Sequence, residues 1–382
     1  MNIDTFYDEN IPPSSTDENI PPSSTEENIL ATSSTDENIP RSSTEDNIPP
    51  SSIDENILAP SSTDDNIPPS STDENILAPS SYITTDNQRK IKHLVISGGS
   101  IWGLSAFGII YEAISCGFLN TDDIVSIYGT SIGAIVGLTI SLKIDHNIIK
   151  DFLINRPCEI LYKKSMCSVL EVFDRKGLIQ HSFFMDFFSP LFKSVDLEMN
   201  LTMKQLYDYN GIEFHIYVTE LNSFKLVDIS YKTHPDWEVL EAISASCSIP
   251  LLFSPLIKDN NCYIDGGFFL NYPISKCIEN VENRDEIFGI LLGGDYTINS
   301  SINSESNIFD LLNVLLNRII NNIDYFSIKK TLNAPYEIHY YLRETTLDFC
   351  FQVLHNKEDR KYLIYNGINQ FKDKFKEWFP IH

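Results

Sequence analysis

The stretch Ser126–Leu138, SIYGTSIGAIVGL, decides the fold, because it reads as a buried strand, a tight turn and a buried helix in direct succession. Gly129, Ser131 and Gly133 form the pattern G-x-S-x-G at the turn. In such a context, small residues relieve a strained strand-to-helix elbow and leave the serine hydroxyl exposed at the helix N-terminus. The longer apolar run Ile124–Leu142 has the length of a membrane span, but its recurring Gly and Ser favour a buried strand, turn and helix.

A similar strand, turn and helix precede this stretch. Lys92–Ser97 is a short apolar run, the turn SGGSIWG follows it, and Leu104–Gly117 then has apolar residues at helical spacing. Two such units in a row indicate an α/β fold, in which a mostly parallel sheet has helices on both faces. Further elements are expected as strands at 214–221, 224–230, 262–267 and 287–294, helices through most of 145–210 and at 237–247, and two amphipathic helices around the strand 336–342 within 307–382.

Residues 1–83 differ in composition from the rest of the chain. From Ser14 to Pro79, units such as SSTDENIPP and SSTEENILAT repeat seven times, each with one Ile or an Ile-Leu pair. So little apolar surface does not offset the entropy of ordering, and we expect residues 1–83 to be disordered acidic Ser/Pro-rich repeats. Residues 1–80 carry −16 of the total net charge of −25, which leaves −9 for the remainder. That balance argues against nucleic acid as a partner and against a general attraction to anionic membranes.

The cysteines and the N-terminus bear on the compartment. The seven cysteines follow no C-x-x-C or His-Cys pattern, which indicates reduced, mostly packed thiols in an intracellular setting. The N-terminus MNIDTFYDEN is acidic and lacks a basic region followed by an apolar run, so no secretory signal is expected. We therefore expect a cytoplasmic protein with no transmembrane span, no metal site and no cofactor.

Two further turns carry residues that suggest chemistry. Ligands of open α/β folds bind at the carboxyl edge of the sheet, where turns after parallel strands meet. In SGGSIWG, Gly98 and Gly99 let backbone N–H groups point at a negative oxygen near a helix N-terminus. In YIDGGF, Asp265 ends a strand. Its carboxylate is a candidate base for the Ser131 hydroxyl, which needs one at neutral pH.

The sequence disfavours two other kinds of site, a nucleotide site and a serine–acid–histidine triad. Gly98 and Gly99 are adjacent, so the spacing G-x-G-x-x-G is not met, and no G-x-x-x-x-G-K-[ST] occurs, which disfavours a nucleotide site. A serine–acid–histidine triad would require His339 or His355 after Asp265. His339 alternates within the strand YEIHYY and His355 precedes the charged stretch NKEDRK, so the triad is also disfavoured.

Taken together, the three turns resemble those of the patatin-like phospholipase family, in which a Ser-Asp dyad cleaves acyl esters. SGGSIWG resembles the oxyanion loop of that family, GTSIG its nucleophile elbow, and DGG, which is Asp265 with Gly266 and Gly267, its aspartate motif. The stretches EAISASCSIPLLFSP and DGGFFLNYPI also continue as the family does. The resemblance implies a patatin-like catalytic domain at 91–277 with three α/β/α layers, followed by a C-terminal α/β extension at 278–382 that packs on the same domain.

The resemblance also implies roles for individual residues. Ser131 would be the nucleophile, and Asp265 would be the base that takes its proton and later activates water. The backbone N–H groups of Gly98, Gly99 and Ser100 would hold the tetrahedral oxyanion. Such donors contribute on the order of 3 kcal/mol each in other acyl-transfer enzymes.

The chain departs from the family pattern at two positions of this loop. Ser100 stands where the family usually has a third Gly, and Trp102 where it usually has Arg or Lys. A serine can donate its backbone N–H there on condition that the loop does not require a positive φ. The aromatic segment 181–192, HSFFMDFFSPLF, is expected to be mainly core packing, with an acyl pocket or a membrane-facing cap as the alternatives.

The leading hypothesis is a lipid acyl hydrolase that acts on phospholipid or neutral glycerolipid and makes transient contact with a membrane surface. One alternative is an acyltransferase, in which a second alcohol replaces water. Another is a degenerate member that binds lipid or a partner protein without turnover, and an activating protein is also left open.

Overall fold

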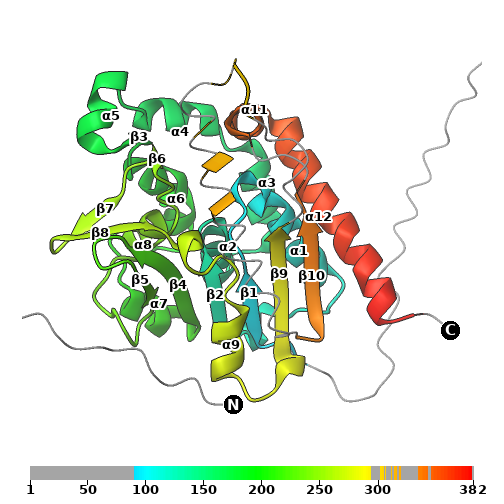
Figure 1. The fold of residues 1–382 in the computed structure, drawn as a ribbon. Coiled ribbons are helices and arrows are strands. Elements are labelled where there is room, and N and C mark those ends of the chain that lie inside the picture. The colour runs from blue at the N-terminus through cyan, green and yellow to red at the C-terminus, as the bar shows by residue number, and fades with distance from the viewer. Residues whose placement is uncertain are drawn as a thin grey trace, which may run out of the picture. The chain divides into compact units, whose positions relative to one another are not determined.

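The computed structural model describes residues 90–293, 334–342 and 346–380, together with isolated positions between 302 and 319. All of them belong to one compact unit, residues 75–382 (Figure 1). The predicted repeats at 1–83 and most of the helix predicted after 307 lie outside the described residues.

The elements follow the predicted order closely. The strands are β1 (His93–Ile96), β2 (Ser126–Thr130), β3 (Gly177–Ile179), β4 (Glu213–Glu220), β5 (Lys225–Ile229), β6 (Leu251–Phe253), β7 (Leu256–Lys258), β8 (Asn261–Asp265), β9 (Ile287–Gly293) and β10 (Tyr336–Tyr341). The α-helices are α1 (Gly103–Ser115), α2 (Ile132–Ser141), α3 (His146–Asn155), α4 (Cys158–Ser165), α5 (Val169–Arg175), α6 (Ser182–Ser194), α7 (Met203–Asn210), α8 (Val239–Ser246), α9 (Ile274–Asn280), α11 (Leu347–His355) and α12 (Lys357–Trp378). The 3₁₀ helices are η1 (Ser100–Trp102), η2 (Thr121–Asp123), η3 (Gly266–Phe268) and η4 (Arg284–Glu286).

The central sheet has eight strands in the order β10-β9-β1-β2-β4-β8-β7, with β5 also paired to β4. Strands β10, β9, β1, β2 and β4 are parallel, whereas β5, β7 and β8 are joined by antiparallel pairs. A separate two-stranded sheet joins β3 and β6. We expected the turn after Asp265 to follow a parallel strand, and this is wrong, because β8 runs antiparallel to β4.

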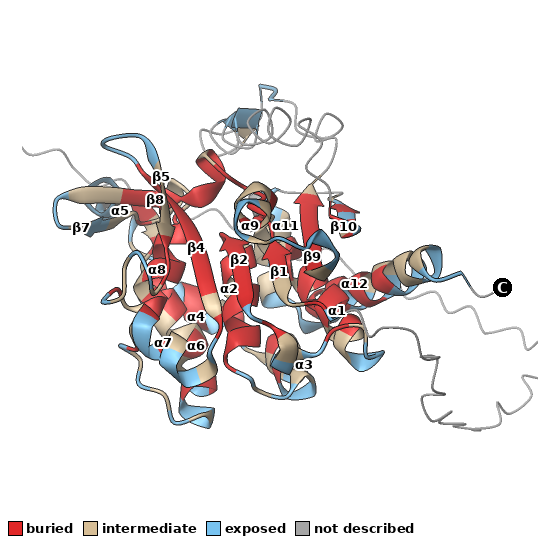
Figure 2. Ribbon diagram, turned by 90° about the horizontal axis from the view of Figure 1, so that it is seen from below, coloured by how far each residue is buried: buried red, intermediate tan, exposed pale blue. Residues whose placement is uncertain are grey.

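The two faces of the sheet bury different cores, because side chains alternate along each strand. On β1, Leu94 and Ile96 join the large core that also includes residues of α1, α2, α8 and α12, whereas Val95 joins a smaller core with Ile274 and Cys277 of α9. Figure 2 shows β1, β2, β4 and β9 mainly buried, β5 and β7 at the edge more open, and the outer surfaces of the helices exposed. The sheet is therefore covered on both sides, as strands rich in Val, Ile and Leu require.

The stretch Ser126–Leu138 forms β2 and most of α2, as predicted, and not a membrane span. Every residue of β2 is buried, and α2 is buried along most of its length. Among the residues that the structure describes, no helix combines the length and apolar character needed to cross a bilayer.

Candidate active site

Ser131 lies at the turn between β2 and α2, in a backbone conformation that residues other than glycine rarely adopt. Its φ is 54° and its ψ is −125°, a state that costs roughly 1–3 kcal/mol and persists only where the surroundings enforce it. A Cβ on Gly133 would lie 2.3 Å from the carbonyl oxygen of Ile96, and one on Gly129 would lie 2.8 Å from the backbone of Ala134. The glycines of G-x-S-x-G therefore let α2 fold back tightly against β1 and β2.

Asp265 reaches Ser131 because β2 and β8 meet end to end. β5 pairs with one edge of β4, and both β2 and β8 pair with the other edge. The last residue of β2, Thr130, lies opposite Tyr217, and the last residue of β8, Asp265, lies opposite the next residue, Val218. Ser131 therefore begins its turn beside Asp265, although β8 runs against the parallel strands.

The Asp265 carboxyl group is buried and fixed by its own turn. Its Oδ1 accepts a hydrogen bond from the Gly267 N–H at 2.7 Å, and the Asp265 N–H donates to the carbonyl oxygen of Ser248 at 3.0 Å. Its Oδ2 is buried and accepts no hydrogen bond of regular geometry from the part of the chain that the structure describes. Hydrogen bonds between catalytic groups are often long or poorly aligned without substrate, so Oδ2 is the oxygen left for a proton.

Burial raises the pKa of Asp265 to about 6, and interactions with the Ser131 hydroxyl and the Gly267 N–H lower it in part. The Cys247 thiol lies in the same place, and burial, with the charge of Asp265, raises its pKa well above its ordinary value. Asp265 is thus ionised at neutral pH yet more basic than an ordinary aspartate, which suits a general base. Cys247 stays a neutral thiol.

The glycine-rich turn after β1 supplies backbone amides to the same place. A Cβ on Gly98 would lie 3.3 Å from the Cβ of Ser131 and 2.2 Å from Oδ1 of Asn271, so a larger residue would have to displace the Asn271 side chain. The Gly98 N–H donates to the carbonyl oxygen of Asn271 at 3.0 Å, so it is already engaged. Gly99 is the N-cap of η1 and Ser100 its first residue, positions where N–H groups have no intrahelical acceptor. These two amides are therefore the better candidates for an oxyanion.

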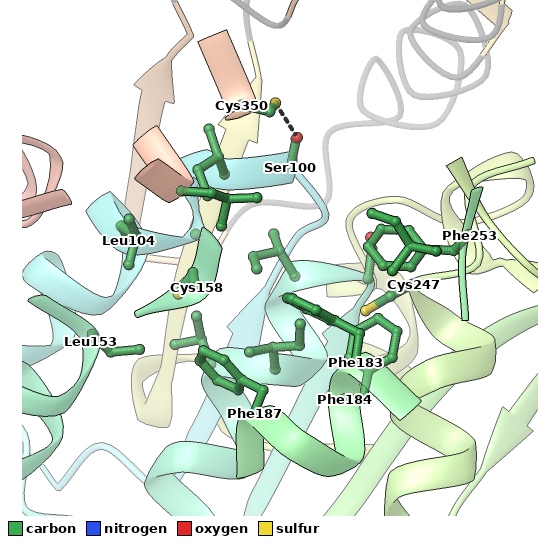
Figure 3. Close-up of a pocket in the computed structure, with 18 of the residues that line it drawn as sticks. Ser100, Leu104, Leu153, Cys158, Phe183, Phe184, Phe187, Cys247, Phe253 and Cys350 are labelled. Carbon is green, nitrogen blue, oxygen red and sulfur yellow. Dashed lines mark hydrogen bonds between the residues drawn. The ribbon is translucent and has the colours of Figure 1, made fainter. Parts of the chain in front are cut away.

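Ser100 does not meet the condition set from the sequence, because its backbone adopts a positive φ. Its φ is 53°, in the left-handed region that costs a residue with a Cβ roughly 1–2 kcal/mol. The Ser100 hydroxyl and the Cys350 thiol of α11 lie in hydrogen-bond contact at 3.2 Å (Figure 3). This contact ties the loop to α11 and helps to hold the conformation.

Trp102 anchors the other end of η1. It is buried, and its ring lies 5.5 Å from that of Phe349 on α11 and 5.7 Å from that of Tyr340 on β10. Where the family usually has Arg or Lys, this chain therefore has a tryptophan that packs on aromatic residues of α11 and β10. The loop is held by the packing of Trp102 and by the contact between Ser100 and Cys350.

An apolar cavity of about 160 Å³ extends from Ser131 between α1, α2, α6 and α11. Figure 3 shows Phe183 and Phe184 of α6 beside Cys247, with Leu104 and Leu153 on the opposite wall. Within the segment 181–192, Phe183, Phe184 and Phe187 line the cavity, and Phe188 and Phe192 are fully buried in the core. The segment 181–192 thus contributes both to the core and to the lining of the cavity, two roles that were expected as alternatives from the sequence.

No histidine that the structure describes lines this cavity. His339 is exposed on β10, and Nε2 of His355 lies 2.6 Å from the hydroxyl of Tyr162. The two histidines considered for a triad are therefore not in the pocket with Ser131. Within the described ranges, no group of His, Cys, Asp and Glu side chains has the arrangement of a metal site.

Three residues of the site were not predicted. Asn271 engages Gly98, Cys247 lies beside Ser131 and Asp265, and Ser246 binds the Ser131 backbone. All three lie in the stretches EAISASCSIPLLFSP and DGGFFLNYPI. These stretches resemble the patatin-like family but do not by themselves indicate a role for the three residues. Their contacts join residues far apart in sequence, so no local pattern indicates them.

Comparison with known proteins bears on the same segment. Residues 94–278 match the family model "Patatin-like phospholipase". A protein of Invertebrate iridescent virus 6 with the name "Probable lipid hydrolase 463L" is 25% identical over 201 residues, which are 50% of this chain and 66% of that protein. The chain therefore spans slightly less than two thirds of this relative. An uncharacterized protein of Acanthamoeba polyphaga mimivirus is 22% identical over 293 residues, which are 75% of this chain and 95% of that protein.

Two solved structures are also similar. VipD from Legionella pneumophila superposes with a TM-score of 0.43 and 14% identity over 75% of this chain and 67% of its own. ExoU from Pseudomonas aeruginosa, solved in complex with SpcU, gives a TM-score of 0.37 and 13% identity over 74% of this chain and 52% of its own. The family-model match, with a mostly parallel sheet covered by helices, confirms the fold class expected from the sequence.

Proposed function

Because the chain belongs to the patatin-like phospholipase family through residues 94–278, we propose that it hydrolyses acyl esters of phospholipids or neutral glycerolipids, with Ser131 as nucleophile and Asp265 as base. The observation that carries this proposal is the buried Asp265 carboxyl group, whose unbonded oxygen lies beside the hydroxyl of a serine held in a strained elbow. A strained nucleophile that lines a cavity and has an adjacent base is the arrangement that activates a serine.

In the first half of the reaction, Oγ of Ser131 attacks the ester carbonyl carbon while Asp265 takes the hydroxyl proton. The carbonyl oxygen becomes an oxyanion, which the N–H groups of Gly99 and Ser100 stabilise. The bond to the leaving alcohol then breaks, and the alcohol receives the proton from Asp265. An acyl group remains on Ser131.

In the second half, Asp265 takes a proton from water, and the resulting hydroxide attacks the acyl carbon. The same amides hold the second oxyanion. The bond to Oγ breaks, Ser131 regains a proton from Asp265, and the fatty acid leaves. No histidine is required in either half.

The cavity supports a lipid acyl chain as the group that is transferred. Its walls include Leu104, Leu153, Phe183 and Phe184, and Ser131 is part of the same lining. An apolar chain in such a pocket loses water on binding, which contributes about 0.8 kcal/mol per buried methylene.

Contact with a lipid surface is part of the proposal, because α4, which contributes to the cavity lining, and α5, which follows it in the chain, expose apolar side chains. Ile160 is 60% exposed and Phe173 is 80% exposed, while Cys158 at the start of α4 lines the cavity.

Hydrolysis of a defined lipid panel by wild type, Ser131→Ala and Asp265→Asn, with products identified, tests the proposal. Free fatty acid from wild type alone supports it. Acyl transfer to an added alcohol in preference to water would identify an acyltransferase. Binding of lipid with no product from any variant would indicate a member of the family without turnover.

The pH dependence should follow Asp265. A base must be ionised to accept a proton, and burial raises the pKa of Asp265 to about 6. We therefore expect kcat/KM to be level above about pH 7 and to fall about tenfold per pH unit well below pH 6. A profile measured with a neutral soluble ester checks this, and a level profile down to about pH 4 would contradict it.

The same pKa shift has opposite effects on activity and stability: ionised Asp265 is needed for the reaction, but it destabilises the folded protein. The pKa of Asp265 is raised from 3.8 to about 6. Its contribution to the free energy of unfolding is therefore fully present below pH 3.8 and is lost as the pH rises through about 6. Asp265→Asn removes that loss, and should raise the unfolding free energy at neutral pH by up to about 3 kcal/mol. Urea unfolding at several pH values measures it, and an Asn variant less stable than wild type at neutral pH would contradict it.

Ser100 offers a test of the oxyanion loop. Ser100→Gly relieves the left-handed strain, so the loop should keep its shape, and we expect kcat within about threefold of wild type. Ser100→Ala keeps the strain and loses the contact with Cys350, so its kcat should be about tenfold lower. Steady-state kinetics of both variants decide the matter. A Gly variant slower than the Ala variant would overturn this account of the loop.

A further inference from the structure

Ser246 is the last residue of α8 and lies in the SAS portion of the stretch EAISASCSIPLLFSP. Its side chain is fully buried. The mechanism proposed above gives it no part, because its hydroxyl faces backbone groups and is absent from the cavity lining.

The Ser246 hydroxyl joins two strand ends through a pair of short hydrogen bonds. Its Oγ accepts the N–H of Ser131 at 2.8 Å and donates to the carbonyl oxygen of Tyr217 at 2.7 Å. Both bonds are buried, and a buried polar group that loses its partner costs far more than an exposed one. The hydroxyl therefore bridges the nucleophile's own amide to β4.

Tyr217 is the residue of β4 at which the two halves of the dyad meet. Thr130, just before the nucleophile, pairs with Tyr217, and Asp265 pairs with the next residue along β4. A Cβ on Gly266 would lie 2.2 Å from the Tyr217 carbonyl oxygen, so the aspartate turn is pressed against the same atom. One carbonyl group thus packs against the aspartate turn and is bonded to the serine turn through Ser246.

We infer that Ser246 is a positioning residue for the reaction: its hydroxyl holds Ser131 at φ 54° and level with Asp265. The pairing of β2 with β4 ends at Thr130. The amide of the next residue, Ser131, is linked to β4 through the Ser246 hydroxyl. The N–H of Ser131 is also occupied by this bond, which leaves the oxyanion to the amides of the glycine-rich turn. The inference rests on the proposed function only for its kinetic readout.

Two measurements on Ser246→Ala, Ser246→Thr and Ser141→Ala test this role. Ser141 is a matched control, because it is equally buried and its Oγ donates one hydrogen bond, to the carbonyl oxygen of Gly137 at 2.9 Å. It lies ten residues from Ser131 along α2, about 15 Å away. Full-length protein is used for the kinetics of ester hydrolysis and for hydrogen exchange of the Ser131 amide.

For Ser246→Ala we expect kcat to fall about 10- to 100-fold with KM nearly unchanged, because the geometry of attack is lost while the cavity is kept. The Ser131 amide should exchange at least about tenfold faster, and Ser246→Thr should recover most of both effects. Ser141→Ala should match wild type in both. Exchange of the Ser131 amide in Ser246→Ala no faster than in Ser141→Ala would overturn the inference. Faster exchange in a protein whose wild type hydrolyses no lipid would uphold it and count against the proposed function alone.

Discussion

Ser131→Ala and Asp265→Asn are each expected to lower kcat for ester hydrolysis by about four orders of magnitude, and the double variant should be no slower than the slower single one. Ser131→Ala removes the protein atom that is proposed to bond to the acyl carbon. Asp265→Asn keeps the size of the side chain, including an oxygen for the Gly267 N–H, but removes the proton acceptor. When two groups act together in one step, removing either one abolishes the contribution of both, so removing the second costs little more.

Steady-state rates of the three variants on one lipid in mixed micelles measure this. Fluorescence binding of a non-hydrolysable ether lipid is the control, since the cavity walls are unchanged and affinity should stay within about threefold of wild type. Losses that multiply in the double variant would show that Ser131 and Asp265 act independently, which the dyad does not allow.

Arg360→Leu is expected to lower the free energy of unfolding by about 3 kcal/mol or more. Arg360 lies on α12 and is buried. Its guanidinium group donates all five of its N–H groups to backbone carbonyl oxygens, which belong to Ile154, Arg156, Val353 and Leu354. These oxygens lie at the C-terminal ends of α3 and α11, where a cation is favourable. The leucine would remove all five of these donors, and the carbonyl oxygen of Arg156 would keep the Cys158 N–H at 2.8 Å.

Two companion variants sharpen the stability test. Arg360→Lys keeps the charge but has three donors without the planar fork, so it should recover less than half of the loss. Arg175→Leu removes an arginine that is 51% exposed and makes long contacts of 3.5 Å with Glu171 and Gln180 on the surface, and should change stability by about 0.5 kcal/mol or less. Urea unfolding of the three variants measures this, and an Arg360→Leu loss no larger than that of Arg175→Leu would contradict the account.

The elbow and the aspartate motif could be predicted from the sequence because their chemistry is local. Gly129, Ser131 and Gly133 follow a recognisable buried strand, and Asp265 precedes a pair of glycines. A turn motif looks the same after a parallel or an antiparallel strand, however. The direction of β8 therefore depends on how it pairs with β4, which the local sequence does not specify.

Other features of the site depend on contacts between distant parts of the chain. The engagement of the Gly98 N–H by Asn271, and the bond between Ser131 and Ser246, join residues more than a hundred positions apart. The positive φ of Ser100 is likewise held by Cys350 from α11. Periodicity and propensity describe neighbours within a few residues, so they carry no information on these pairings.

The central claim is that the Ser131 hydroxyl is the nucleophile, and covalent capture tests it most directly. Wild type, Ser131→Ala and Asp265→Asn would be treated with a fluorophosphonate probe, and the labelled peptide identified by mass spectrometry. The account predicts one phosphonyl group on Ser131 in wild type, none on the Ala variant, and labelling of the Asn variant slowed by about a hundredfold or more. Labelling of another residue at the wild-type rate in Ser131→Ala, or no labelling of folded wild type, would contradict it.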